Sequence, residues 1–388
     1  MSVRKRTWKT AAGEERQAWL CDYTGQSGKR HVKTFARKKD ADAFIAKAKV
    51  EVREGVHTAD SDSVTIRDAA DLWLTTGAAR GLERATLAAY EQHARLHIVP
   101  SLGRVKLSRI SAPAVRDFED RLRTDGRSAA MIRKILTSLG SMLSDAQERG
   151  LVSRNVVRDL GSRRKKGVDR RADKRQKGHL KVGVDIPSRE EIRAIVGALQ
   201  GLWRPVLLTA IFTGLRASEL RGLRWADVDL KKGELYVRQR ADRYNAIGAP
   251  KSESGERTVP LPPIMANALR ELRLTCPVGA DIVFVSSRGH VRSHSNIVFY
   301  GWHPAQVAAG VVTPDGAAQY PGLHALRHFY ASWCINRRED GGLGLTPKLV
   351  QERLGHSTIG MTLDVYGHLF PRGDDGSELA AAEKSLLG

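Results

Sequence analysis

The sequence predicts a multidomain protein that is mainly α-helical and carries small β-sheets, for three reasons. A chain of 388 residues is longer than one ordinary domain, so we expect two or three domains, each with its own core. Apolar residues recur at helical spacing through much of the chain, whereas strand-like patterns are confined to short stretches. A basic stretch with almost no apolar residues, at positions 161–183, divides the chain.

Residues 1–63 are expected to fold as a small sheet with one helix. Residues 17–23 and 30–35 have the pattern of a hairpin on either side of the turn sequence TGQSGK. Residues 39–53 then place apolar side chains near helical spacing. The region holds 14 basic and nine acidic residues, so a solvated basic appendage is the alternative interpretation.

Residues 64–160 predict four amphipathic helices. Pro100 is expected to stop the second helix, because proline lacks a backbone donor. His93 and His97 lie four residues apart on that helix, but no third ligand accompanies them, so helix-face histidines are favoured over a metal site. The predicted apolar faces consist of Ile66, Ala69, Ala70 and Trp73; Leu87, Tyr90, Ala94 and Ile98; Val115, Phe118 and Leu122; and Ile132, Ile135, Leu136, Leu139, Met142, Leu143 and Ala146.

The stretch from residue 161 to 185 is predicted to be a basic linker. Residues 161–183 contain ten basic and two acidic side chains, and they have too few apolar residues to build a core. A linker of this charge can contact the phosphates of a polyanion, and simple solvation is the alternative interpretation.

Residues 186–370 are expected to form a mixed α+β domain. Ser188 and Glu191 have the spacing of a capping box at its start. Residues 225–239 and 256–261 have the pattern of strands, and helical patterns surround them.

The net charge of +21 and the isoelectric point of about 10.2 favour a polyanionic partner. An anionic membrane surface would also fit the charge, but no apolar run reaches the roughly 18 residues of a spanning helix. The N-terminal sequence MSVRKRTWKT lacks the apolar core of a signal peptide. We therefore expect a cytoplasmic protein that binds no membrane. Cys21, Cys276 and Cys334 have no spacing typical of a disulfide scaffold or a zinc site.

A set of side chains suited to phosphoryl transfer lies in the C-terminal half. Two arginines, a lysine, two histidines and a tyrosine occur in the segments TGLRASEL, APKSESGERTVPLP, GLHALRHFYAS and LGHSTIGMTLDVY. No carboxylate cluster accompanies them to hold a metal, and neither a metal nor another cofactor is expected. The candidate catalytic residues are Arg216, Lys251, His324, Arg327, His356 and Tyr366.

In this order, the segments resemble the catalytic signature of the tyrosine recombinases, the phage-type integrase family. The resemblance implies that Tyr366 attacks a DNA phosphate and forms a 3′-phosphotyrosine, leaving a free 5′-hydroxyl. Arg216 and Arg327 would stabilise the charge that grows on the phosphate oxygens. Glu219 resembles a supporting acid that orients its neighbours.

The remaining candidates receive their roles from the same resemblance. His324, one helical turn before Arg327, would accept the phenolic proton, and His356 would be a further donor to the phosphate. Lys251 would protonate the leaving 5′ oxygen. The neighbouring lysines of residues 231–232, and His368, are alternatives to Lys251 and His356 that match the family's segments less well.

The resemblance also assigns functions to the domains. Residues 1–63 would be an arm-type DNA-binding domain, residues 64–160 a helical, SAM-like core-binding domain, and residues 186–370 the tyrosine recombinase catalytic domain. Residues 371–388 would be a tail whose short helix docks onto a neighbouring protomer.

Site-specific recombination of a phage or another mobile element, by way of a Holliday junction, is therefore the expected function. The expected partners are double-stranded DNA with core and arm sites, a homotetramer on that DNA, and accessory proteins for bending and directionality. The expected location is the cytoplasm of a bacterial host, in association with the nucleoid. A type IB topoisomerase and a catalytically idle DNA-binding protein are the alternatives.

Overall fold

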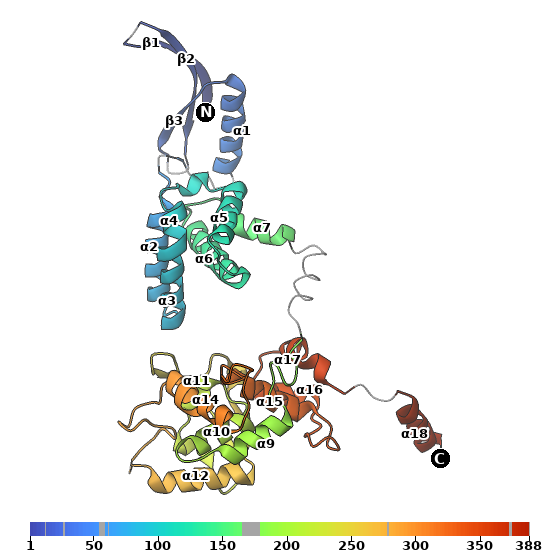
Figure 1. Ribbon diagram of the computed structural model, residues 1–388. Coiled ribbons are helices and arrows are strands. Elements are labelled where there is room, and N and C mark those ends of the chain that lie inside the picture. The colour runs from blue at the N-terminus through green and yellow to red at the C-terminus, as the bar shows by residue number, and fades with distance from the viewer. Residues whose placement is uncertain are drawn as a thin grey trace. The chain divides into compact units, whose positions relative to one another are not determined.

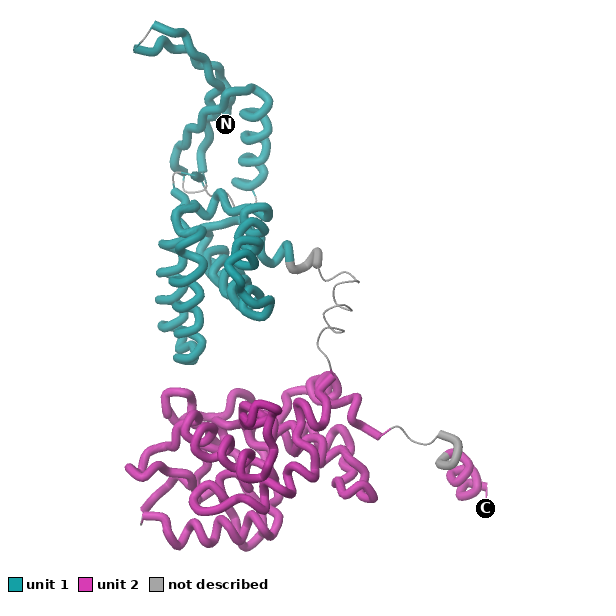
Figure 2. Tube along the Cα trace, viewed as in Figure 1, with its two compact units in different colours: residues 1–176 teal, residues 177–388 magenta. Residues whose placement is uncertain are grey.

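The computed structural model describes residues 1–11, 13–25, 28–53, 59–60, 62–164, 179–277, 279–371 and 375–387. The chain forms two compact units, residues 1–176 and residues 177–388 (Figure 2). Most of the predicted linker, residues 165–178, lies outside the described residues. Helices predominate and the sheets are small and antiparallel, which confirms the predicted fold class (Figure 1).

The first unit opens with an antiparallel sheet of order β1-β2-β3. Its elements are β1 Ser2–Lys9, β2 Glu15–Thr24, β3 Arg30–Phe35 and the covering helix α1 Lys38–Arg53. Tyr23 of β2 is buried, and its ring lies 5.5 Å from that of Phe44 on α1. The predicted hairpin and helix are therefore confirmed. Strand β1 is not predicted from the sequence because almost all its side chains are exposed, and it is held by backbone pairing with β2.

Asp60 ties this sheet to the helices that follow. Its carboxylate lies 3.3 Å from Lys33 Nζ in β3 and 3.2 Å from the guanidinium of Arg109. Burial alone would raise the pKa of the Asp60 carboxyl, but the Ser108 hydroxyl and these two cations lower it to about 2. These ion pairs of Asp60 therefore hold the connection between the sheet and the helices in place.

The helical part of the first unit contains α2 Ile66–Ala79, α3 Arg84–His93, α4 Val99–Leu102, α5 Ala112–Thr124, α6 Ala129–Glu148 and α7 Val156–Arg164. Most of the predicted apolar faces meet in one core. The expectation that Pro100 ends a helix is wrong: α3 passes through a π-helical turn into α4, and Pro100 lies in the first turn of α4. His93 is buried, and its Nδ1 lies 2.8 Å from Ser138 Oγ.

The second unit is a mixed α+β fold. Its helices are α9 Arg189–Ala198, α10 Trp203–Thr213, α11 Ala217–Arg221, α12 Pro263–Thr275, α13 His294–Asn296, α14 His303–Ala308, α15 His324–Ile335, α16 Pro347–Leu354, α17 Ile359–Tyr366 and α18 Asp375–Leu387. Its strands are β4 Val228–Asp229, β5 Glu234–Val237 and β8 Arg257–Pro260 in one antiparallel sheet, and β6 Arg240–Ala241 with β7 Ile247–Gly248 in a hairpin.

Helix α10 is the centre of this unit, since it is buried along nearly its whole length and packs against α12 and α15. The capping box of Ser188 and Glu191 at the start of α9 is confirmed. No helix within the described ranges is long and apolar enough to cross a membrane.

Candidate active site

A left-handed turn at Gly214 places Arg216. Helix α10 ends at Gly214, whose φ is +58°, and Arg216 then caps α11. The Arg216 Nη1 donates to Glu219 Oε1 at 2.7 Å, and Nη2 donates to the carbonyl oxygen of Gly355 at 2.9 Å. The guanidinium is therefore fixed by a carboxylate on its own helix and by a backbone group 139 residues away in sequence.

Helix α15 supplies His324 and Arg327 one turn apart. The Arg327 side chain is almost completely buried and donates to the carbonyl oxygens of Gly214 at 2.7 Å and Leu354 at 2.6 Å. Burial, and next the charge of Arg216, lower the pKa of Arg327 to about 10, which still leaves it charged at neutral pH. Arg327 thus joins the turn before Arg216 to the end of α16.

His356 follows α16 through another left-handed turn, at Gly355. Its Nδ1 lies 2.9 Å from Thr362 Oγ1 on α17, and its ring is parallel to that of Tyr366 with centroids 6.3 Å apart. Burial, followed by the charges of nearby arginines, lowers the pKa of His356 to about 4. The ring is therefore neutral at neutral pH and is held against the helix that carries the tyrosine.

Tyr366 is the last residue of α17, and only 1% of its surface is exposed. Burial raises the pKa of its phenol to about 12, and the charge of Arg327 opposes this shift. The phenolic oxygen lies 2.8 Å from His328 Nδ1. His328 is not among the residues predicted from the sequence, although its position four residues after His324 on one helix is a signal that could have found it.

His324 lies at the exposed start of α15, and its ring centroid is 4.5 Å from that of His328. The surrounding protein partly removes the His324 ring from water. This desolvation, followed by the charges of Arg327 and Arg216, lowers the pKa of His324. The structure thus brings five of the predicted residues into one cluster: Arg216, His324, Arg327, His356 and Tyr366.

Lys251 lies on an exposed loop between β7 and β8 and is not part of the cluster that these five residues form. The base of the loop is attached to the cluster through Arg257, which donates to the Arg353 carbonyl at 2.7 Å and to Glu219 at 2.8 Å. The alternative His368 is directed elsewhere, because its Nε2 lies 2.9 Å from the carbonyl oxygen of Leu180.

Glu219 is the buried counter-charge of the cluster. Only 3% of its side chain is exposed, and it pairs with both Arg216 and Arg257. Burial would raise the pKa of the Glu219 carboxyl, but these arginines lower it overall. One carboxylate between two arginines, with Arg327 and neutral histidines nearby, leaves a positive site suited to a phosphate.

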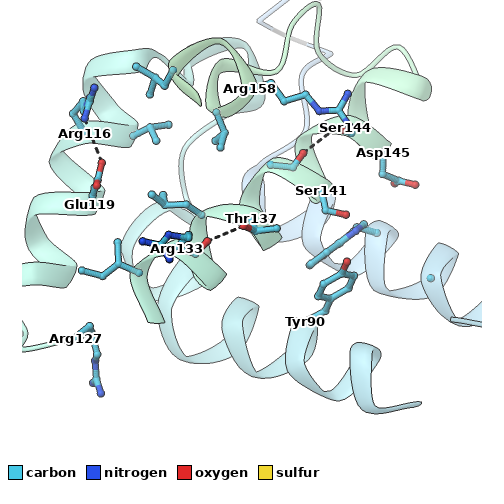
Figure 3. Close-up of a pocket in the computed structure, with 18 of the residues that line it drawn as sticks. Tyr90, Arg116, Glu119, Arg127, Arg133, Thr137, Ser141, Ser144, Asp145 and Arg158 are labelled. Atoms are coloured by element: carbon cyan, nitrogen blue, oxygen red, sulfur yellow. Dashed lines mark hydrogen bonds and ion pairs between the residues drawn. The ribbon is translucent and has the colours of Figure 1, made fainter. Parts of the chain in front are cut away.

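A separate groove of about 1060 Å³ lies in the first unit, lined by residues of α2, α3, α5, α6 and α7. Its wall carries several arginines, among them Arg116, Arg127, Arg133 and Arg158 (Figure 3). Trp73 stacks on Tyr90 at one side, with ring centroids 4.3 Å apart. None of the predicted catalytic residues lines it, so the candidate active site is the cluster in the second unit.

No group of three or more histidine, cysteine, aspartate or glutamate side chains in the described part of the chain could hold a metal ion.

The second unit is similar to a known protein family. The phage integrase family profile matches residues 189–372, a range that contains all six candidate residues. A tyrosine recombinase XerC-like protein of Caldanaerobacter subterraneus subsp. tengcongensis is 27% identical over 362 residues, covering 86% of this chain and 87% of that protein. A prophage integrase of Escherichia coli, IntR, is 27% identical over 263 residues, covering 62% of this chain and 58% of that protein.

Solved structures show the same fold. The Tn1549 transposon integrase in complex with a circular intermediate DNA aligns with a TM-score of 0.62 at 20% identity, covering 84% of this chain and all of that one. A lambda integrase tetramer bound to a Holliday junction aligns with a TM-score of 0.55 at 19% identity, covering 91% and 95% of the two chains. The domain at residues 189–372 belongs to the phage integrase family, and the chain is a tyrosine-type site-specific recombinase.

Proposed function

We propose that the chain cuts and rejoins double-stranded DNA through a covalent bond between Tyr366 and a 3′-phosphate. The observation that carries this proposal is the position of the Tyr366 ring, which lies in one cluster with Arg216, Arg327 and His356. In the forward step the phenolic oxygen bonds to phosphorus and the bond to the 5′ oxygen breaks. Attack by a 5′-hydroxyl of another strand reverses the step, so the phosphodiester energy is kept and no nucleotide is consumed.

Arg216 and Arg327 would bind the non-bridging oxygens of the scissile phosphate. Each guanidinium uses N–H groups of both terminal nitrogens to anchor itself in the fold. The other N–H donors of these forks can be offered to phosphate without reorganisation, as transition-state stabilisation requires. His324 begins the helix that carries Arg327, and His356 follows Leu354, whose carbonyl oxygen Arg327 binds; both histidines would complete the contacts to the phosphate.

Lys251 would protonate the leaving 5′ oxygen, which requires its loop to close over bound DNA. Arg257 supports this role, because it links the loop base at Gly255 (2.9 Å) to Glu219 (2.8 Å) and hence to Arg216. An exposed lysine on an anchored loop can reach a phosphate that the cluster already holds.

The assembly we propose is a homotetramer around two DNA duplexes. Residues 64–160 would be the core-binding domain, residues 186–370 the catalytic domain and residues 161–185 the basic linker. Residues 1–63 would bind separate arm sites. This proposal is supported by the lambda integrase tetramer bound to a Holliday junction and by the Tn1549 integrase in complex with a circular intermediate DNA.

The biological setting belongs to the same proposal. We expect the protein to act in a bacterial cytoplasm on the nucleoid, with DNA-bending and directionality proteins as accessory partners. Its relatives are described as integrases, recombinases and transposases, which favours recombination over the relaxation of DNA by a topoisomerase.

A nicked suicide duplex that carries the mapped core site tests the proposal. Wild-type protein should form a covalent complex that survives denaturation, because the released 5′ fragment diffuses away and cannot reverse the step. The Tyr366→Phe variant should bind the duplex with nearly unchanged affinity and form no such complex. An adduct with the Phe variant would assign the nucleophile to another residue.

A further inference from the structure

The hydrogen bond between His328 and Tyr366 has no place in the roles given above. His328 Nδ1 lies 2.8 Å from the phenolic oxygen, with the two rings 5.7 Å apart and inclined at 63°. The residues come from α15 and α17 and are 38 positions apart in sequence, so the packing of these helices creates the contact. It involves the very atom that is to attack phosphorus.

We propose that His328 is a further catalytic residue, which accepts the proton of Tyr366 as the phenolic oxygen attacks the phosphate. The inference rests on the proposed function and deepens it. A general base must lie within hydrogen-bonding distance of the proton that it removes, and His328 meets this requirement before DNA is bound. His324, which the family resemblance assigned to this step, lies instead at the exposed start of α15 beside the His328 ring.

The step balances without a further reactant. The O–H bond of Tyr366 breaks, its electron pair forms the bond to phosphorus, and Nδ1 of His328 takes the proton. The bond from phosphorus to the 5′ oxygen breaks at the same time, and the Lys251 ammonium protonates that oxygen. When a 5′-hydroxyl attacks the phosphotyrosine, the His328 imidazolium returns its proton to the phenol and the lysine recovers its own.

The surroundings keep His328 neutral, as a proton acceptor must be. Burial, and then His324 and Arg327, lower the pKa of His328 to about 4, and the smaller effect of Asp185 acts in the opposite direction. The phenol faces it with a pKa of about 12, so the proton stays on Tyr366 in the free protein. An anionic phosphate bound beside the imidazole favours its charged form, which links proton transfer to the binding of DNA.

A positioning role would need the hydrogen bond but not the basicity of His328, and the two can be separated. His328→Asn keeps an oxygen that can accept a hydrogen bond from the phenolic O–H group, but this oxygen cannot take up the proton. His328→Ala removes both. Single-turnover cleavage of the suicide duplex by the full-length protein should fall roughly 100-fold or more in both variants, with DNA affinity retained. A near-normal rate for the Asn variant, or for both, would overturn the proposal.

A duplex with sulfur in place of the bridging 5′ oxygen provides the matched control. Sulfur leaves without protonation, so this substrate should restore cleavage by Lys251→Ala but not by His328→Ala. Added imidazole should restore part of the rate of His328→Ala only. Rescue of His328→Ala by the sulfur substrate would place it on the leaving-group side and contradict the proposal.

Two further measurements cover the case in which His328→Ala does not fold and separate this proposal from the proposed function. If His328→Ala does not fold, as judged by circular dichroism and DNA binding, fluorotyrosine at position 366 in otherwise wild-type protein replaces it. The phenol of fluorotyrosine is more acidic than that of tyrosine, so the alkaline limb of the pH–rate profile for cleavage should shift to lower pH. An unshifted limb would refute proton transfer to His328. An adduct with Tyr366→Phe would instead refute the proposed function as a whole.

Discussion

Replacing Gly214 by alanine tests how the turn before Arg216 is held. A Cβ atom there would lie 2.4 Å from Cδ1 and 2.9 Å from Cγ of Tyr330, a ring that is 1% exposed and has little room to move. The left-handed backbone, with φ of +58°, costs an alanine roughly 1–2 kcal/mol, and overpacking adds roughly 1–3 kcal/mol. We therefore expect Gly214→Ala to lower the free energy of unfolding of the second unit by roughly 2–5 kcal/mol.

Gly201→Ala is the matched control at the other end of α10. Its φ is +56°, and an added Cβ would meet nothing within 4 Å, so only the backbone cost of roughly 1–2 kcal/mol applies. Urea unfolding can be followed by thiol labelling of the buried Cys334, with Cys21 and Cys276 replaced by alanine. Equal losses in the two variants would show that the Tyr330 ring yields without cost, and would refute the reasoning.

Three other predictions concern the charge of the site and the ends of the chain. The lowered pKa of Glu219 means that its ion pairs stabilise the fold fully above its ordinary value of 4.5, and that this stability is lost as pH falls through the lower folded value. Glu219→Gln should therefore cost roughly 3–5 kcal/mol in urea unfolding at neutral pH, and the cost should shrink in acid; a constant cost would contradict the ion-pair account. Deleting residues 374–388, which include the exposed Leu386 and Leu387, should weaken tetramer assembly on DNA more than half-site binding in sedimentation experiments, and unchanged assembly would count against docking in trans. A protein that begins at Ser63 should lose the arm-site protections in footprinting and keep the core ones, whereas identical footprints would make the N-terminal region a non-specific appendage.

Features set by neighbouring residues could be predicted from the sequence. The capping box at Ser188 and the apolar face of α6 depend on contacts within one or two helical turns, and both are found in the structure. The five clustered catalytic candidates could be selected because their order along the chain is distinctive. Strand β1 could not be predicted, since its backbone pairing leaves no apolar pattern in its side chains.

Most features that could not be predicted from the sequence depend on contacts between residues far apart in the chain. Arg327 is fixed by the carbonyl oxygens of Gly214 and Leu354, and backbone acceptors leave no signature in side-chain identity. The contact of His328 with Tyr366 depends on how α15 packs against α17. The continuation of the helix past Pro100 depends on a π-helical turn that accommodates the missing donor.

Identification of the residue that bears DNA in the trapped complex tests the central claim most directly. The covalent complex of wild-type protein with the suicide duplex would be digested with trypsin and nuclease, and the nucleotide-bearing peptide sequenced by mass spectrometry. We predict that one peptide, containing Tyr366, carries the 3′-phosphate on its phenolic oxygen. A nucleotide attached to any other residue, or a complex with no covalent bond, would contradict the account.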